Sequence, residues 1–155
     1  MSETMCGIIG YIGMRRASNI LLNGLKRLEY RGYDSCGMAL LGSGLQVKKD
    51  VGKVEEVDKK LNFLDLVGTI GVAHTRWATH GGVTPANAHP HLSNNKKIAV
   101  VHNGIVENFQ ELKNFLQKNG FTFYSETDTE VIPNLIQFEM MQGKDFVDAT
   151  KAALK

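Results

Sequence analysis

Short apolar runs that end in polar, glycine-containing residues constrain the fold of this chain more than any other feature. Four places combine glycine with reactive or polar side chains at one end of such a run: residues 6–7, 30–35, 74–81 and 102–104. Short apolar runs are typical of buried strands, and a strand that ends in polar residues presents them at the rim of its sheet. We therefore expect a sheet rim at which these places assemble a site.

Strand and helix patterns are mixed along the chain without strict strand–helix–strand repeats. This mixture predicts an α+β fold in which helices are layered on a mostly antiparallel sheet. The expected strands cover residues 6–12, 35–41, 45–50, 69–73 and 97–102, and a long polar loop covers 74–95. The expected helices cover residues 17–29, 54–61, about 109–120, about 128–141 and 146–155.

Two of these helices have the spacing of a capping box at their N-termini. Asn108 is followed three residues later by Glu111, and Thr127 by Glu130. In a capping box, the two side chains satisfy backbone N–H groups that the first helical turn leaves without partners. Pro133 lies within the second of these helices and lacks an N–H, so we expect it to kink or loosen that helix.

The composition is that of one globular domain. With 155 residues, 43% hydrophobic and 22% charged, the chain can form one core but not two large ones. A net charge of +2 gives no reason to expect nucleic acid or a membrane surface as a partner. No apolar stretch approaches the roughly 18 residues of a transmembrane helix. Two cysteines cannot form a disulfide scaffold, so we expect a reduced, cytoplasmic setting.

Cys6 is the candidate nucleophile if it is the first residue of the mature chain. A thiol attacks only as the thiolate, so a nearby base must take its proton. The α-amino group of an N-terminal cysteine titrates at about 7.7 to 8.0 and suits this role, whereas the amide nitrogen of an internal cysteine does not. Residues 1–5 precede Cys6. Either translation starts at Met5, or a propeptide is removed, or the chain is inactive as made. The alternative is that Cys6 is a small buried strand residue.

Four other residues have the chemistry that acyl transfer from an amino-acid substrate requires. The Asn103 side-chain amide and the Gly104 N–H can both donate to one developing oxyanion. Arg76 can bind a carboxylate with two hydrogen bonds, and Asp128 can bind an ammonium group. Each residue also has a structural alternative: an Asn-Gly turn, a surface ion pair for Arg76, and a favourable helix N-terminal charge for Asp128.

The histidines and glycines do not match a metal or nucleotide motif. His74, His80, His89 and His91 show neither CxxC nor HExxH spacing, and the early glycines do not form GxGxxG or a P-loop. We therefore expect neither a metal nor another cofactor. Cys36 lies in an apolar strand and is expected to pack in the core.

Taken together, the motifs resemble a known family over essentially the whole chain after Met5. The chain resembles the glutaminase domain of the glutamine–fructose-6-phosphate aminotransferase family, a branch of the class II glutamine amidotransferases. The Cys-Gly start and the Asn-Gly pair are shared among class II enzymes, whereas the second and third motifs are typical of this branch. The motifs, in chain order, are Met5-Cys6-Gly7-Ile8, Leu28-Glu29-Tyr30-Arg31-Gly32-Tyr33-Asp34-Ser35, His74-Thr75-Arg76-Trp77-Ala78-Thr79-His80-Gly81, His102-Asn103-Gly104-Ile105 and Thr127-Asp128-Thr129-Glu130.

The resemblance implies a fold and a reaction. The fold would be the N-terminal-nucleophile αββα sandwich, incomplete at its C-terminal end. Cys6 would attack the side-chain amide of glutamine, release ammonia and form a γ-glutamyl thioester that is hydrolysed to glutamate. Asn103 and the Gly104 N–H match the oxyanion hole of the family, Arg76 matches the residue that binds the substrate carboxylate, and Asp128 matches the one that binds its ammonium.

The resemblance also assigns residues around this centre. Trp77, Thr79 and His80 match a mobile glutamine loop whose tryptophan gates the passage of ammonia, and Arg31 matches a residue beside the nucleophile. Residues 1–5 would be a leader or upstream extension, and residues 6–155 a C-terminally truncated amidotransferase domain. The sugar-isomerase domains, or a partner chain in their place, would be missing, and the full-length enzyme would be a homo-oligomer.

Three functions remain open from the sequence. The first is glutamine hydrolysis that supplies ammonia for conversion of fructose-6-phosphate to glucosamine-6-phosphate in the full-length enzyme. The second is a non-catalytic module that binds glutamine or glutamate while a blocked Cys6 stays silent. The third is a structural fragment that is completed only beside missing strands. The last interpretation predicts exposed apolar sheet edges that need a partner or cause association.

Overall fold

The computed structural model describes residues 6–78 and 81–155. The strands are β1 (Gly7–Ile12), β2 (Ser35–Leu41), β3 (Leu45–Val51), β4 (Ile70–Arg76), β5 (His91–Leu92) and β6 (Ala99–Val100). The α-helices are α1 (Ala17–Leu28), α2 (Val54–Leu61), α3 (Phe109–Lys118), α4 (Val131–Met141) and α5 (Phe146–Ala153). Three short 3-10 helices are η1 (Glu29–Arg31), η2 (Phe63–Asp65) and η3 (Asp128–Glu130).

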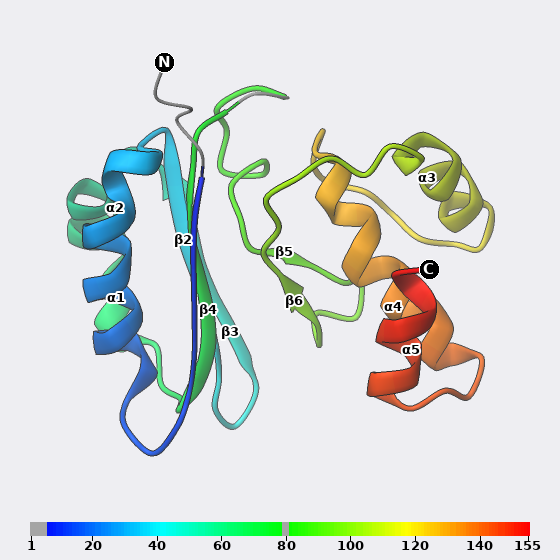
Figure 1. Cartoon of the computed structure of the whole chain (residues 1–155), viewed down its shortest axis with the longest axis horizontal. Coiled ribbons are helices and arrows are strands. Elements are labelled where there is room, and N and C mark those ends of the chain that lie inside the picture. Colours follow the sequence, from blue (N-terminus) through cyan, green and yellow to red (C-terminus); the bar gives the residue numbers. More distant parts are fainter. Residues whose placement is uncertain (1–5, 79–80) are drawn as a thin grey trace.

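The elements form successive layers (Figure 1). Helices α1 and α2 cover one face of a four-stranded antiparallel sheet with strand order β1-β4-β2-β3. The short antiparallel ribbon β5–β6 lies on the other side of this sheet, and α4 and α5 lie beyond the ribbon. The layers therefore follow the order helix, sheet, sheet, helix. We call the helix-covered side of the large sheet its outer face and the ribbon side its inner face.

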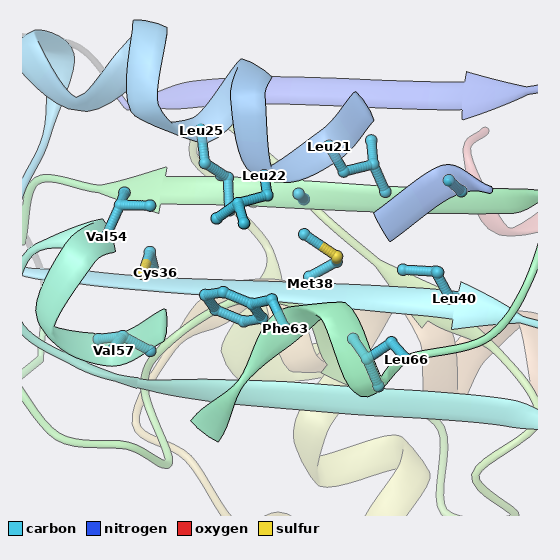
Figure 2. Packing of buried hydrophobic residues seen from close by; sticks show 12 residues of the cluster. Leu21, Leu22, Leu25, Cys36, Met38, Leu40, Val54, Val57, Phe63 and Leu66 are labelled. Carbon is cyan, nitrogen blue, oxygen red and sulfur yellow. The ribbon is translucent and has the colours of Figure 1, made fainter. Parts of the chain in front are cut away.

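The main core fills the space between the outer face and its helices (Figure 2). Met38 and Leu40, two residues apart on β2, point to this side because side chains alternate between the faces of a strand. Leu21 and Leu25 from α1 and Phe63 from η2 pack against them, and all five side chains are fully buried. The four-residue spacing of the two leucines places them on one face of α1.

The inner face is covered at one end and exposed at the other. Near the end where β1 begins and β4 ends, Gly37 lies against the backbone of His89, where a Cβ atom would overlap the carbonyl oxygen. At the far end, Ile12, Ile70 and Leu41 are register partners in neighbouring strands, and their side chains are 76%, 40% and 47% exposed. We call these three residues the apolar row.

Two smaller clusters hold the second helical layer together. Ile98, Ile136 and Ala149 join the ribbon segment to α4 and α5. Leu116 and Val131 are buried between α3 and α4, together with residues of the turn that follows α3. No helix within 6–78 and 81–155 combines the length and apolar character needed to span a bilayer.

Several expected boundaries were wrong for identifiable reasons. Strand β4 continues to Arg76, three residues beyond the predicted end, because its polar residues are buried with partners. The strand predicted for 97–102 is reduced to β6, and β5 lies within the predicted loop. Pro133 is the third residue of α4, where an α-helix has no intrahelical partner for the N–H in any case.

Both predicted capping boxes were also wrong. Neither Asn108 nor Thr127 accepts a capping hydrogen bond with its side chain. Glu130 instead accepts hydrogen bonds from the backbone N–H groups of Tyr124 and Ser125, at 3.0 and 2.7 Å. The carboxylate therefore organises the turn before η3 rather than a helix N-terminus.

Candidate active site

Cys6 lies at the rim of the large sheet where β1 begins and β4 ends. The antiparallel register pairs Gly7 with Thr75, and the Gly7 N–H donates to the Thr75 hydroxyl at 3.2 Å. This pairing brings the half-buried Cys6 beside Trp77. The Trp77 N–H donates to Cys6 Sγ at 3.2 Å, and the Cys6 thiol in turn donates to the Trp77 carbonyl oxygen at 3.5 Å.

Asn103 reaches the same rim from the segment after β6. Its Nδ2 donates to the carbonyl oxygen of Cys6 at 2.9 Å, and its Oδ1 lies 2.8 Å from His74 Nε2. Gly104 follows with φ of 154°, a backbone conformation that favours glycine. A Cβ atom on Gly104 would lie 2.8 Å from His102 Nε2. The chain thus places an amide donor beside Cys6, with a glycine directly after it.

Arg76 and Asp128 provide opposite charges at this rim. Arg76 is 5% exposed and donates from Nη1 to the Gly82 carbonyl oxygen at 3.2 Å. Burial lowers the pKa of its guanidinium, whereas Cys6, Asp34 and Asp128 act in the opposite direction. All three acidic groups therefore lie within electrostatic reach of Arg76. Asp128, at the start of η3, accepts a hydrogen bond from the Val106 N–H at 2.7 Å through Oδ2.

The 30–35 motif supports the rim from behind. A Cβ atom on Gly32 would lie 2.7 Å from the backbone of both Arg76 and Trp77, so the close approach of these segments requires glycine. Asp34 accepts a hydrogen bond from the Ala78 N–H at 2.9 Å. The rings of Tyr33 and Trp77 meet edge to face with centroids 5.2 Å apart. Each contact fixes the chain just before residue 79.

Of the remaining predicted site residues, the structure describes only Arg31, and no hydrogen bond joins it to Cys6. Arg31 is half-buried in η1, within this motif, and among the described residues its side chain makes no hydrogen bond or ion pair. Thr79 and His80 lie outside the described residues. The structure therefore brings Cys6, Arg76 and Trp77 together with the Asn103 and Asp128 segments.

Sequence reasoning missed a stack of buried histidines behind Asn103. The rings of His74 and His89 are stacked with centroids 4.2 Å apart, and His91 meets His89 edge-on at 4.5 Å. Burial is the largest cause that lowers the pKa values, to about 4 for His74 and about 3 for His91, and it also lowers the pKa of His89. The stack is therefore neutral at pH 7. The His89-Pro90-His91 motif is the available signal, but the sequence alone does not show that His74 stacks on it.

A second feature missed from the sequence anchors the far end of the 77–82 segment. The Asn87 amide donates to the Gly82 carbonyl oxygen at 2.9 Å and to Glu126 at 3.0 Å. Glu126 also accepts from the Gly82 N–H at 3.2 Å. These hydrogen bonds lower the pKa of Glu126. Among residues 6–78 and 81–155, no group of three or more His, Cys, Asp or Glu side chains has the arrangement of a metal site.

Comparison with known proteins decides the family. A family model for a glutamine amidotransferase domain matches residues 57–152. The chain belongs to the glutamine amidotransferase family. A relative named glutamine–fructose-6-phosphate aminotransferase (isomerizing) from Methanococcus maripaludis is 58% identical over 94% of this chain and 24% of its own length. A relative of the same name from Pyrococcus horikoshii is 58% identical over 97% of this chain and 25% of its own. The chain thus spans about a quarter of these relatives, and the family resemblance is confirmed.

Solved structures with the same fold support this membership. One is the glutamine phosphoribosylpyrophosphate amidotransferase from B. subtilis, with a TM-score of 0.80 and 28% identity over 95% of this chain and 32% of that chain. Another is described as the allosteric regulatory enzyme of purine biosynthesis, with a TM-score of 0.83 and 31% identity over the same shares. The predicted α+β fold of the N-terminal-nucleophile class is confirmed.

Proposed function

We propose that this chain is the glutamine-hydrolysing part of a hexosephosphate aminotransferase and releases ammonia and glutamate through Cys6. The observation that supports this most strongly is the convergence of two donors on one cysteine. The Trp77 N–H meets its sulfur, and the Asn103 amide meets its carbonyl oxygen. In a member of the glutamine amidotransferase family, a thiol placed in this way is suited to attack an amide carbon.

The reaction needs an α-amino group at Cys6. In a chain that begins at this residue, the amine takes the thiol proton, and the thiolate attacks the side-chain carbonyl carbon of glutamine. Asn103 Nδ2 and the Gly104 N–H donate to the oxyanion that forms. The C–N bond then breaks, the amine returns its proton to the leaving nitrogen, and ammonia departs. Water hydrolyses the γ-glutamyl thioester and restores the thiol with glutamate as product.

Substrate binding is assigned to the opposite charges of the rim. Arg76 would bind the α-carboxylate of glutamine, and Asp128 the α-ammonium group. Asp128 Oδ2 accepts from the Val106 N–H and Oδ1 accepts from the Thr129 hydroxyl at 3.4 Å, and a carboxylate oxygen retains a further lone pair for the ligand. Trp77, together with Thr79 and His80, would form the loop over the substrate.

The wider role of the domain follows from its relatives. We assign residues 6–155 to the amidotransferase domain and residues 1–5 to an upstream extension. Ammonia would serve the conversion of fructose-6-phosphate to glucosamine-6-phosphate, with the sugar chemistry in the part of the relatives that this chain does not span. Arg31, within the 30–35 motif, would contribute to the site when that part is present. We further propose a homo-oligomeric full-length enzyme in the cytoplasm, where the free thiols of Cys6 and Cys36 are maintained.

The proposal is tested by glutamate release from glutamine. A chain whose intact mass begins at Cys6 should turn over, and Cys6→Ala should reduce the rate to background. Cys36→Ala is a matched control, since burial raises the pKa of this thiol to about 12 and leaves it unreactive. Absence of turnover in a folded chain with a proven free Cys6 amine would refute hydrolysis by residues 6–155 alone.

The alternative is binding without hydrolysis, and residues 1–5 are the observation that favours it. While they are attached, the Cys6 nitrogen is an amide and cannot act as a base. Calorimetry on the chain that retains Met1 should then detect glutamine, and Arg76→Met should abolish the heat. A complete lack of binding heat in the unaltered chain would exclude this alternative.

A further inference from the structure

His74 occupies a position that no part of the reaction above uses. It lies on β4 at the inner face of the sheet, 1% exposed, three residues before Trp77. Its Nε2 is 2.8 Å from Asn103 Oδ1. Asn103 itself is exposed and belongs to a segment without regular secondary structure. An exposed side chain on such a segment has several accessible rotamers, so a contact with a buried ring restricts it strongly.

The hydrogen-bond partners determine which atom of Asn103 faces which neighbour. The Cys6 carbonyl oxygen can only accept, so the atom 2.9 Å from it must be Nδ2. Oδ1 therefore faces His74. Because Oδ1 can only accept, His74 Nε2 must carry the hydrogen. One assignment of the amide and one tautomer of the ring satisfy both contacts.

The surroundings of His74 favour this tautomer. Its Nδ1 is buried and has no hydrogen-bond partner among the described residues. In the neutral ring, Nδ1 then carries no hydrogen, and the single ring N–H is the one on Nε2 that donates to Asn103 Oδ1. The alternative tautomer would bury an N–H without a partner and would leave Oδ1 without a donor, and both changes are unfavourable. Stacking on His89 at 4.2 Å fixes the plane of the ring.

We propose that His74 is a positioning residue for glutamine hydrolysis, which holds Asn103 Oδ1 so that Nδ2 stays turned toward Cys6. This inference rests on the function proposed for the site. An amide nitrogen has two N–H bonds: one meets the Cys6 carbonyl oxygen, and the second remains available for the oxyanion. Without His74 the side chain can rotate or flip, which would direct an oxygen rather than a donor toward the developing negative charge.

Two variants separate the hydrogen bond from packing. His74→Phe keeps a flat ring against His89 but removes the donor, whereas His74→Gln restores a donor without the ring. In chains that begin at Cys6, we expect His74→Phe to lower kcat about tenfold or more, since loss of an oxyanion donor outright costs about 10² to 10³. The KM for glutamine should stay within about twofold because Arg76 and Asp128 are unchanged. His74→Gln should recover much of kcat. Equal losses in both variants would indicate packing alone and overturn the proposal.

A measurement on the unaltered chain tests the contact without turnover. The ¹⁵N shifts of the His74 ring in residues 1–155 report which nitrogen carries hydrogen, and the side-chain amide of Asn103 is assigned by its loss in Asn103→Asp. We expect hydrogen on Nε2 at pH 7, and Asn103 amide signals that move toward those of a free amide in His74→Phe. Hydrogen on Nδ1, or unchanged Asn103 signals in folded His74→Phe, would overturn the proposal. A chain with the expected spectra but no turnover would refute only the proposed hydrolysis.

Discussion

The two faces of the large sheet are built from the same four strands but differ in what covers them. On the outer face, α1, α2 and η2 enclose a continuous apolar core (Figure 2). On the inner face, a polar segment with two of the stacked histidines covers only the end near Cys6, and the apolar row stays exposed. The two faces therefore serve different purposes: apolar burial on the outer face stabilises the fold, while the polar cover on the inner face positions the candidate site.

The largest difference is expected between two neighbouring leucines of β2. Leu40 is fully buried on the outer face, and Leu41 is 47% exposed on the inner face. Leu40→Ala should lower the free energy of unfolding by about 3 kcal/mol, because it leaves a cavity in the core. Leu41→Ala should cost less than about 1 kcal/mol. Urea unfolding measures both, and equal losses would mean that the faces do not differ as described.

A smaller effect is expected at the covered end of the inner face. Gly37→Ala would place a Cβ atom against the His89 carbonyl oxygen, and backbone on both sides must shift. We expect a loss of about 1 to 3 kcal/mol, as is typical of overpacking. Gly44→Ala is the matched control, since no atom lies within 4 Å of its added Cβ. A neutral Gly37→Ala would contradict the tight cover of this end.

The histidine stack should make the inner face sensitive to acid. The folded-state pKa values lie below the usual 6.5, so each neutral, buried histidine makes its full contribution to stability above about pH 6.5. As the pH falls from 6.5 toward 4, the unfolded chain takes up protons that the folded chain refuses, and stability is lost. Arg76 and Lys49 face the stack and oppose its protonation further.

His89→Phe removes one of the groups that take up a proton when the chain unfolds. Between pH 7 and 5 the variant should lose about 1 to 2 kcal/mol less unfolding free energy than the unaltered chain, because one fewer proton is linked to unfolding. Chemical denaturation at several pH values gives the two slopes. His102→Phe is the comparison variant, since His102 is half-buried and lies outside the stack. Parallel slopes for His89→Phe and the unaltered chain would show that the stack is not held neutral.

The smallest effect on stability is expected in the apolar row. Ile12 is 76% exposed, so Ile12→Gln should change the free energy of unfolding by less than about 0.5 kcal/mol. The same change should reduce self-association at high concentration, because it interrupts exposed apolar surface. Light scattering measures the association. Val147→Gln, at an exposed position on α5, is the matched control and should leave association unchanged.

The outer face was predictable from the sequence, and the inner face only in part. Strand β2 and helix α2 follow from apolar patterns because most of their buried side chains are apolar. Strand β4 was predicted to end at Ala73 because His74, Thr75 and Arg76 are polar. Their burial depends on partners distant in sequence, such as Gly7 for Thr75 and Asn103 for His74.

The site shows the same division. Cys6, Arg76 and Asn103 could be predicted as site residues because each lies at one end of an apolar run, and their chemistry could be judged residue by residue. The histidine stack was missed because ring contacts arise only when residues 86–92 cross the sheet. The two capping boxes failed since residue spacing does not show which backbone N–H a carboxylate such as Glu130 will meet.

In the proposed reaction, Cys6 forms a γ-glutamyl thioester and needs its own α-amino group to do so. Intact mass and peptide mapping after brief exposure to glutamine and an acid quench detect this thioester. We predict a γ-glutamyl adduct on the N-terminal peptide of chains that begin at Cys6, and none on chains that retain Met5 or carry Cys6→Ala. An equal adduct on Met5-bearing chains would contradict the need for the Cys6 amine. No adduct together with no glutamate release from folded chains that begin at Cys6 would contradict acylation of this residue.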